Sequence, residues 1–214
     1  EHQPMEDTMD KFAKSFEADT SKILNIVINS LYSDRDIFLR ELLSNASDAI
    51  QKRRFQGQTT PAILNSEDDQ IEIIINAKKK YVEIRDNGIG LNDEELSETL
   101  GTIAKSGTAG FLQEIEDNKD AKSAAQSLIG KFGVGFYSAF MVADTVEVTT
   151  RKAGTDKAYT WASDGQTGYD ISQSDMNQPV GTCVKLFLKK DAKEYCEGSR
   201  IRNLVKKYSD HIQI

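Results

Sequence analysis

Apolar residues recur at helical spacing in two stretches near the start of the chain. Residues 20–31 are rich in Ile, Leu and Val, and residues 36–55 carry an apolar stripe beside a polar one. This periodicity predicts two helices, and Ser33 or Asp34 is the expected cap of the second. The apolar stripe of the second helix consists of Leu39, Leu42, Leu43, Ala46 and Ile50.

Further along, apolar and polar residues alternate over short segments separated by turn residues, which is typical of strands. Asn92 or Asp93 is expected to open a short helix between the second and third strands, and residues 194–208 to form a closing helix. Helices gather in the first half of the chain and strands in the second, which favours a two-layer α/β (α+β) sandwich. The predicted strands are residues 70–76, 81–85, 145–150, 158–162, 168–171 and 181–188.

The chain divides into an arm and one domain. Residues 1–19 are polar and acidic and are interpreted as a flexible amino-terminal arm, whereas residues 20–214 form the domain. Within the domain, glycines at both ends of a polar stretch at about 101–135 are what a mobile lid needs. A long surface loop that contains a helix is the alternative.

Composition narrows the class of protein. The 214 residues are 38% hydrophobic and 29% charged, with a net charge of -7 and a pI near 5.0, so no nucleic-acid or anionic-membrane partner is expected. No secretory or transit signal is recognisable at the start, which leaves the compartment open. Two thiols are favoured over a disulfide for Cys183 and Cys196, while His2 and His211 have no metal-ligand spacing.

The polar stripe of the second helix has an unusual make-up. At about 100° per residue, Glu41, Asn45, Asp48 and Lys52 fall within about 60° of one another. A solvated helix face is the simple explanation. However, Asn and Asp are poor residues for a helix interior, and a carboxylate, an amide and a second carboxylate in one row can hold a cation and a water.

Three glycine-rich motifs follow. Residues 86–90 (Asp-Asn-Gly-Ile-Gly) come at the end of a predicted strand, and residues 101–108 have the letters of a phosphate-binding loop with the lysine misplaced. Residues 130–135 reverse the dinucleotide fingerprint and follow no strand, so that interpretation is weak. This last turn still leads into a predicted helix at 136–142, and its backbone N–H groups could hold an anion; tight turns alone are the alternative.

In this order, the motifs resemble those of the gyrase, heat-shock protein 90, histidine kinase and MutL-type ATPase superfamily. That resemblance implies the Bergerat ATP-binding fold, a mixed, mostly antiparallel sheet covered by helices. The match to the heat-shock protein 90 chaperone family covers nearly the whole chain and is carried by residues 37–49, 100–108 and 132–140. The chain is similar to the amino-terminal nucleotide-binding domain, and residues 161–165 are among those most like the mitochondrial paralogue.

The resemblance implies binding of ATP and ADP with Mg²⁺, and slow ATP hydrolysis that is weak in the isolated domain. Lid closure would be coupled to the folding of client proteins, with co-chaperones acting on the full-length protein. A full-length homodimer, a monomeric isolated domain and no nucleic-acid or membrane partner are expected. The implied location is the mitochondrial matrix, with the cytoplasm as the alternative.

Site roles are carried over by resemblance. Glu41 would be the catalytic base that activates water, Asn45 would coordinate Mg²⁺, and Asp86 would accept a hydrogen bond from the adenine amine with help from Gly90 and Thr182. The other expected nucleotide-binding residues are Asp48, Lys52, Ile89, Leu91, Leu100, Lys105, Gly133, Val134, Gly135 and Phe136.

Three positions depart from the family pattern. Thr99 replaces an asparagine near the ribose, Lys131 replaces a glutamine in the phosphate turn, and Leu91 replaces a methionine of similar volume. A DNA-processing ATPase of the gyrase or MutL type is the alternative within the superfamily, although the acidic charge disfavours it. A sensor kinase would not need Glu41 as a base. A nucleotide-sensing module that does not hydrolyse ATP is the non-enzymatic alternative.

Overall fold

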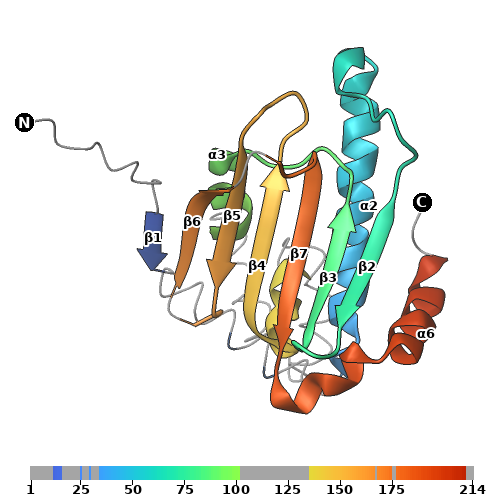
Figure 1. The fold of residues 1–214 in the computed structure, drawn as a ribbon, viewed down its shortest axis with the longest axis vertical. Coiled ribbons are helices and arrows are strands. Elements are labelled where there is room, and N and C mark those ends of the chain that lie inside the picture. Colours follow the sequence, from blue (N-terminus) through green and yellow to red (C-terminus); the bar gives the residue numbers. More distant parts are fainter. Residues whose placement is uncertain are drawn as a thin grey trace, which may run out of the picture.

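The sheet is the framework of the protein. The computed structural model describes residues 12–15, 25, 29, 34–101, 135–166, 168–174 and 177–210. Seven strands form one sheet in the order β1-β6-β5-β4-β7-β3-β2, and every described pairing is antiparallel (Figure 1). The strands are β1 Phe12–Ser15, β2 Ile71–Asn76, β3 Tyr81–Asp86, β4 Ala143–Arg151, β5 Ala158–Ser163, β6 Gly168–Ser174 and β7 Gly181–Leu188.

Helices cover one face of this sheet. The long helix α2 packs on β3 and on η4, and Figure 1 shows it behind the right-hand strands, with α6 beside its lower end. Alternate strand residues such as Val82, Val148, Trp161 and Leu186 point toward the helices and are buried with Phe38 of α2. The helical segments are α2 Ile37–Gly57, η2 Pro61–Ile63, α3 Asp93–Leu96, η3 Ser97–Gly101, η4 Gly135–Met141, η5 Lys190–Cys196 and α6 Gly198–Ser209.

The two-layer α/β sandwich expected from the sequence is confirmed, and so are the six predicted strands and the helix over residues 36–55. The sheet is antiparallel at each described pairing, in keeping with the mostly antiparallel sheet that was expected. Asn92 opens α3 as predicted: its side chain accepts from the N–H of Glu95 at 2.8 Å, and the Glu95 carboxylate accepts from the N–H of Asn92 at 3.2 Å. Cys183 and Cys196 are free thiols, also as expected.

Two expected elements differ. The closing helix is interrupted, since η5 ends at Cys196 and α6 begins at Gly198 with an extended residue between them. The expected arm, residues 1–19, contributes β1, which pairs with β6. Backbone hydrogen bonds to an edge strand need no apolar pattern, so composition could not indicate this strand. Among the described helices, none has the length and apolar character to cross a membrane.

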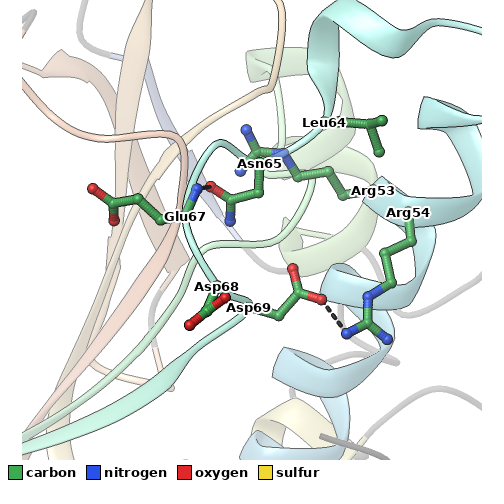
Figure 2. A pocket seen from close by; sticks show the side chains of 7 residues that line it. All are labelled: Arg53, Arg54, Leu64, Asn65, Glu67, Asp68 and Asp69. Carbon is green, nitrogen blue, oxygen red and sulfur yellow. Dashed lines mark hydrogen bonds and ion pairs between the residues drawn. The ribbon is translucent and has the colours of Figure 1, made fainter.

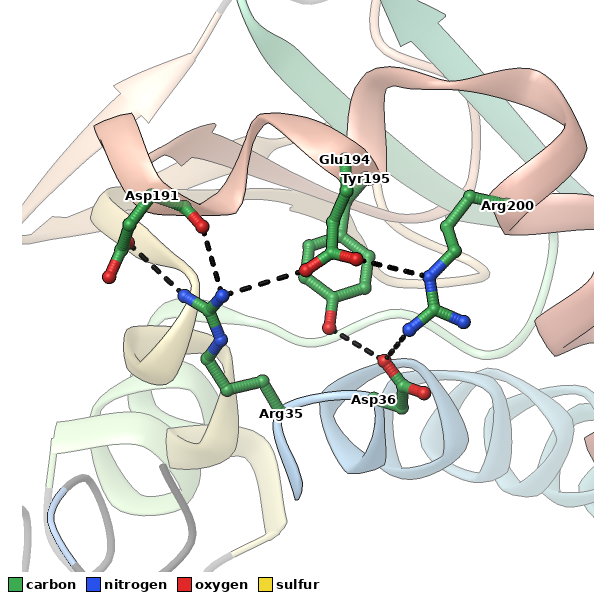
Figure 3. A network of polar contacts seen from close by, with 6 residues as sticks. All are labelled: Arg35, Asp36, Asp191, Glu194, Tyr195 and Arg200. Atoms are coloured by element: carbon green, nitrogen blue, oxygen red, sulfur yellow. Dashed lines mark hydrogen bonds and ion pairs between the residues drawn. The ribbon is translucent and has the colours of Figure 1, made fainter. Parts of the chain in front are cut away.

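The start of α2 is held by a polar network instead of a capping side chain. Asp36 is the N-cap residue, where Ser33 or Asp34 was expected; Ser33 lies outside the described residues. The Asp36 carboxylate accepts from the Tyr195 hydroxyl at 2.6 Å and from Arg200 at 2.5 Å (Figure 3). Burial opposes ionisation, but these two hydrogen bonds lower the pKa of Asp36. Arg35 adds ion pairs to Asp191 and Glu194, so η5 and α6 anchor the helix that carries Glu41.

Candidate functional site

The polar stripe of α2 faces a cavity of about 430 Å³. The opposite side of the cavity is formed by the loop after β3, by the end of η3 and by the first residues of η4. Strands β4 and β7 contribute Val148, Thr182 and Val184. The lining residues from the helices and loops are Glu41, Leu42, Ser44, Asn45, Ala46, Asp48, Ala49, Lys52, Ile89, Gly90, Leu91, Thr99, Leu100, Gly135 and Phe136.

Glu41 lies between Arg40 and η4. One carboxylate oxygen, Oε1, accepts from Arg40 Nη2 at 2.9 Å and from Nε at 3.3 Å. The other, Oε2, lies against Gly135, where a Cβ atom would overlap it. The side chain is only 14% exposed. Glycine at position 135 therefore leaves room for the carboxylate at the edge of the cavity.

The turn after β3 is tied to α2 and to the sheet. Ile89 donates its N–H to the carbonyl of Ala49 on α2 at 3.0 Å, and its own carbonyl accepts from the N–H of Ala153 at 2.8 Å. Gly90 has φ +69°, and a Cβ there would overlap the Arg151 carbonyl, so the close approach of the two loops requires glycine. A Cβ at Gly88 would likewise overlap the backbone of Ala49, so both glycines of the Gly-x-Gly motif are required here.

Asp86 ends β3 beside the cavity. Its Oδ1 accepts from the N–H of Gly88 at 2.9 Å, and it faces Thr182 in the register of β3 and β7. Desolvation by burial raises the pKa of Asp86 to about 7, although hydrogen bonds from the backbone of Gly88 and Thr182 work in the opposite direction. A partly buried, desolvated carboxylate with a raised pKa is the sort of group found at functional sites.

Thr150 links the loop to the sheet. This fully buried hydroxyl accepts from the N–H of Leu91 at 2.9 Å and lies 2.9 Å from the hydroxyl of Thr182. It also donates to the Gly181 carbonyl at 3.2 Å. The hydroxyl of Thr182 is thereby held at the cavity wall.

Comparison with known proteins agrees with this geometry. Residues 32–183 match the family model described as "Histidine kinase-, DNA gyrase B-, and HSP90-like ATPase". The chain belongs to this ATPase family. The matched segment contains α2, the turn after β3 and Thr182, which are the elements that build the cavity.

Members similar over almost the whole chain are named "Chaperone protein HtpG". The protein from Rhodospirillum rubrum is 50% identical over 201 residues, which are 94% of this chain and 32% of the relative. Those from Roseobacter denitrificans and Wolbachia pipientis wMel are each 49% identical, covering 97% and 92% of this chain and 33% and 31% of the relatives. The chain spans about a third of the length of the curated relatives it matches.

The structure brings together eleven of the residues expected to form the ATPase site at the wall of one cavity. They are Glu41, Asn45, Asp48, Lys52, Ile89, Gly90, Leu91, Leu100, Gly135, Phe136 and Thr182. Asp86 lies next to the cavity, beside Thr182, but does not line it. Lys105, Gly133 and Val134 lie outside the described residues, as does nearly all of the expected lid at 101–135.

Sequence reasoning missed part of the cavity wall. Val148 and Val184 form its floor from adjacent strands, and Ser44 and Ala49 flank the polar stripe. Both valines lie in predicted strands, but no local signal distinguishes a core valine from one that borders a cavity.

The site fits an adenine nucleotide with Mg²⁺ in size and in chemistry. Ligand cavities are mainly apolar with a few convergent polar groups. This one combines Leu, Ile, Val and Phe walls with two carboxylates, an amide, a lysine and three hydroxyls. No cluster of three or more His, Cys, Asp or Glu residues could hold a metal in the described part of the chain. Mg²⁺ bound with nucleotides takes most of its ligands from phosphate and water, and the amide oxygen of Asn45 is one oxygen donor available at the cavity wall.

Proposed function

We propose that the chain binds ATP and ADP in the cavity beside α2. The observation that carries this proposal is the meeting of the polar stripe of α2 with the Ile89–Leu91 loop around one cavity, next to the desolvated carboxylate of Asp86. Membership of the ATPase family supports it.

In this proposal, Asp86 binds the adenine ring of the nucleotide. Its ionised carboxylate would accept from the exocyclic amine of adenine, while Thr182 and the backbone at Gly90 bind the ring through water. A hydrogen bond to a charged acceptor is worth roughly 1.5–3 kcal/mol, which is enough to select adenine in a largely apolar cavity. The apolar side chains of Ile89 and Leu91 would cover the ring.

The phosphates lie toward Glu41 and Asn45 in this proposal. Asn45 would hold Mg²⁺, which when bound neutralises phosphate charge. The described cavity carries two carboxylates, Glu41 and Asp48, and one cation, Lys52, so it needs further positive charge to hold a triphosphate. We propose that Lys105 supplies it and that the backbone at Gly133–Phe136 binds phosphate oxygens.

Hydrolysis requires a water aligned with the terminal phosphorus. Glu41 would orient this water and accept its proton as the oxygen attacks phosphorus, while the bond to the bridging oxygen of ADP breaks and phosphate leaves. The Arg40 ion pair occupies one oxygen of Glu41, and the other oxygen, Oε2, would receive the proton. Gly135 leaves space beside that oxygen.

For the full-length protein, we propose an HtpG-like chaperone in which this ATPase drives the folding of client proteins with co-chaperones. The HtpG names of its relatives support a chaperone over a DNA-processing ATPase. An amino-terminal position of the domain in a homodimer, and a lid at about 101–135 that closes over nucleotide, belong to the same proposal. Because these relatives are bacterial, they favour the cytoplasmic alternative over the mitochondrial matrix.

The binding proposal is tested by calorimetric titration of the 214-residue chain with ADP and MgCl₂. Saturable binding by the wild type and its loss in Asp86→Asn are expected, because an amide lacks the charged acceptor. Glu94→Gln, an exposed carboxyl outside the cavity, is the control. Equal affinity in wild type and Asp86→Asn would refute the role of Asp86.

Hydrolysis is tested in the full-length protein. Glu41→Ala should lower ATP turnover roughly 10²–10⁴-fold while ADP affinity stays close to that of the wild type. Normal turnover in this variant would remove Glu41 from the reaction. A wild-type protein that binds ATP but never hydrolyses it would identify a nucleotide-sensing module.

A further inference from the structure

The turn between Asp86 and Gly88 is held from the side of the segment 61–70. The carbonyl of its middle residue, Asn87, accepts from Arg53 Nη1 at 2.8 Å and from Asn65 Nδ2 at 3.3 Å. The same guanidinium donates from Nε to the carbonyl of Ile63 at 2.7 Å. Arg53 therefore joins α2 both to this turn and to the segment that precedes β2.

The side chain of Asn87 completes the attachment. Its Oδ1 accepts from the N–H of Gln70 at 2.9 Å, and its Nδ2 donates to the carbonyl of Asp68 at 2.9 Å. The residue before it is Asp86, whose Oδ1 accepts from the N–H of Gly88 in the same turn. Because both partners of this last bond belong to the turn, the direction of the carboxylate follows the position of the Asn87 backbone.

A second cavity, of about 510 Å³, lies on this side of α2 and is lined by Arg53, Arg54 and residues of the segment 64–69 (Figure 2). Arg54 points to Asp69, with which it forms an ion pair, and Figure 2 shows the two side chains together. Of the two arginines, only Arg53 donates a hydrogen bond to the turn. Arg53 and Arg54 therefore line the same cavity, but only Arg53 can influence the position of Asp86 through the turn.

We propose that Arg53 is a positioning residue for base recognition. Through the Asn87 carbonyl, it holds the turn so that the Asp86 carboxylate meets the exocyclic amine of adenine. The proposal rests on the proposed function and adds a residue that does not line the nucleotide cavity. It assigns selectivity between bases, rather than phosphate binding, to Arg53.

The chemistry of arginine suits this role. A planar guanidinium presents several N–H donors in a fixed fork, so Arg53 bonds to the Ile63 and Asn87 carbonyls at the same time. A lysine ammonium is a point charge on a flexible stem and would not hold both carbonyls in one geometry. Arg53→Lys should therefore behave like Arg53→Met with respect to selectivity.

The test compares ADP with inosine diphosphate, which has a carbonyl oxygen where ADP has the amine. The wild type should prefer ADP by at least about tenfold, since one charged hydrogen bond is gained and a repulsion avoided. In Arg53→Met and Arg53→Lys the preference should fall several-fold, mainly through weaker ADP binding. The matched control, Arg54→Met, should keep the wild-type preference.

The outcomes separate positioning from general damage. Equal loss of both nucleotides in the Arg53 variants would mean a merely structural role and overturn the proposal, as would an unchanged preference. Asn65→Ala removes the weaker donor to the same carbonyl and should lower the preference in the same direction, even if the Arg53 variants fold poorly. Wild-type protein that binds neither nucleotide would instead overturn the proposed function, and the positioning role with it.

Discussion

Burial of the Asp86 carboxyl should make the domain less stable as pH rises. Its pKa is about 7 in the folded protein against an ordinary value of 3.8, because desolvation disfavours the charged form. Between these two pH values the folded state binds more protons than the unfolded state, so the free energy of unfolding falls with increasing pH. This contribution is fully present below about pH 4 and is lost as pH passes through 7.

The magnitude follows from the shift of about 3 pH units. At about 1.4 kcal/mol per unit, the full loss is about 4 kcal/mol, of which about 2.5 kcal/mol falls between pH 5 and pH 8. Asp86→Asn has no proton to exchange there. The free energy of unfolding of the variant, relative to that of the wild type, should therefore rise by about 2.5 kcal/mol from pH 5 to pH 8. A constant difference introduced by the amide does not affect this change.

Urea denaturation of both proteins at pH 5, 6, 7 and 8 measures this difference. Comparing how the free energy of unfolding of each protein changes with pH cancels the contributions of all other titrating groups. It also cancels any hydrogen bond that the amide changes. Glu94→Gln controls for the loss of one surface charge. Parallel stability curves for wild type and Asp86→Asn would refute the reasoning, because they would mean that Asp86 has the same pKa folded and unfolded.

Substitutions at three further positions test the site and its support. Gly135→Ala places a methyl against the Glu41 carboxylate, so ATP turnover of the full-length protein should fall at least about tenfold; normal turnover would contradict the contact. Thr150→Val leaves loop and sheet partners unpaired and should cost about 1–3 kcal/mol in urea denaturation, while Thr150→Ser restores most of it. Arg200→Met should destabilise by about 1–3 kcal/mol at pH 7, measured in the same way. The loss should shrink in acid because the pKa of Asp36 is lowered in the fold; a pH-independent loss would argue against this pair.

Local patterns determined the secondary structure and much of the site. The 3.6-residue repeat of α2 placed Glu41, Asn45 and Asp48 on one face, and the structure shows that face lining the cavity. Asn92 capped α3 as expected, since a cap involves only neighbouring residues. The sequence placed Gly88 and Gly90 in a motif at the end of a strand, and the structure shows that a Cβ atom at either position would overlap neighbouring backbone.

Contacts between distant segments could not be predicted in this way. Asp36 was passed over as the N-cap of α2 because its partners, Tyr195 and Arg200, lie about 160 residues away in the chain. The break between η5 and α6 at the extended residue Glu197 was missed, although the turn residues Gly198 and Ser199 follow it directly.

The sequence by itself determined that α2 has a polar face, that a Gly-x-Gly turn follows β3 and that these motifs belong to one ATPase family. The tertiary structure alone decided which strands form the floor of the cavity, that Asp86 is desolvated and that Arg53 bonds to its turn. The physical reason is the separation along the chain between the residues that interact. Periodicity and caps depend on neighbours within a few residues, whereas burial and the raised pKa of Asp86 depend on α2 and β7 packing around β3.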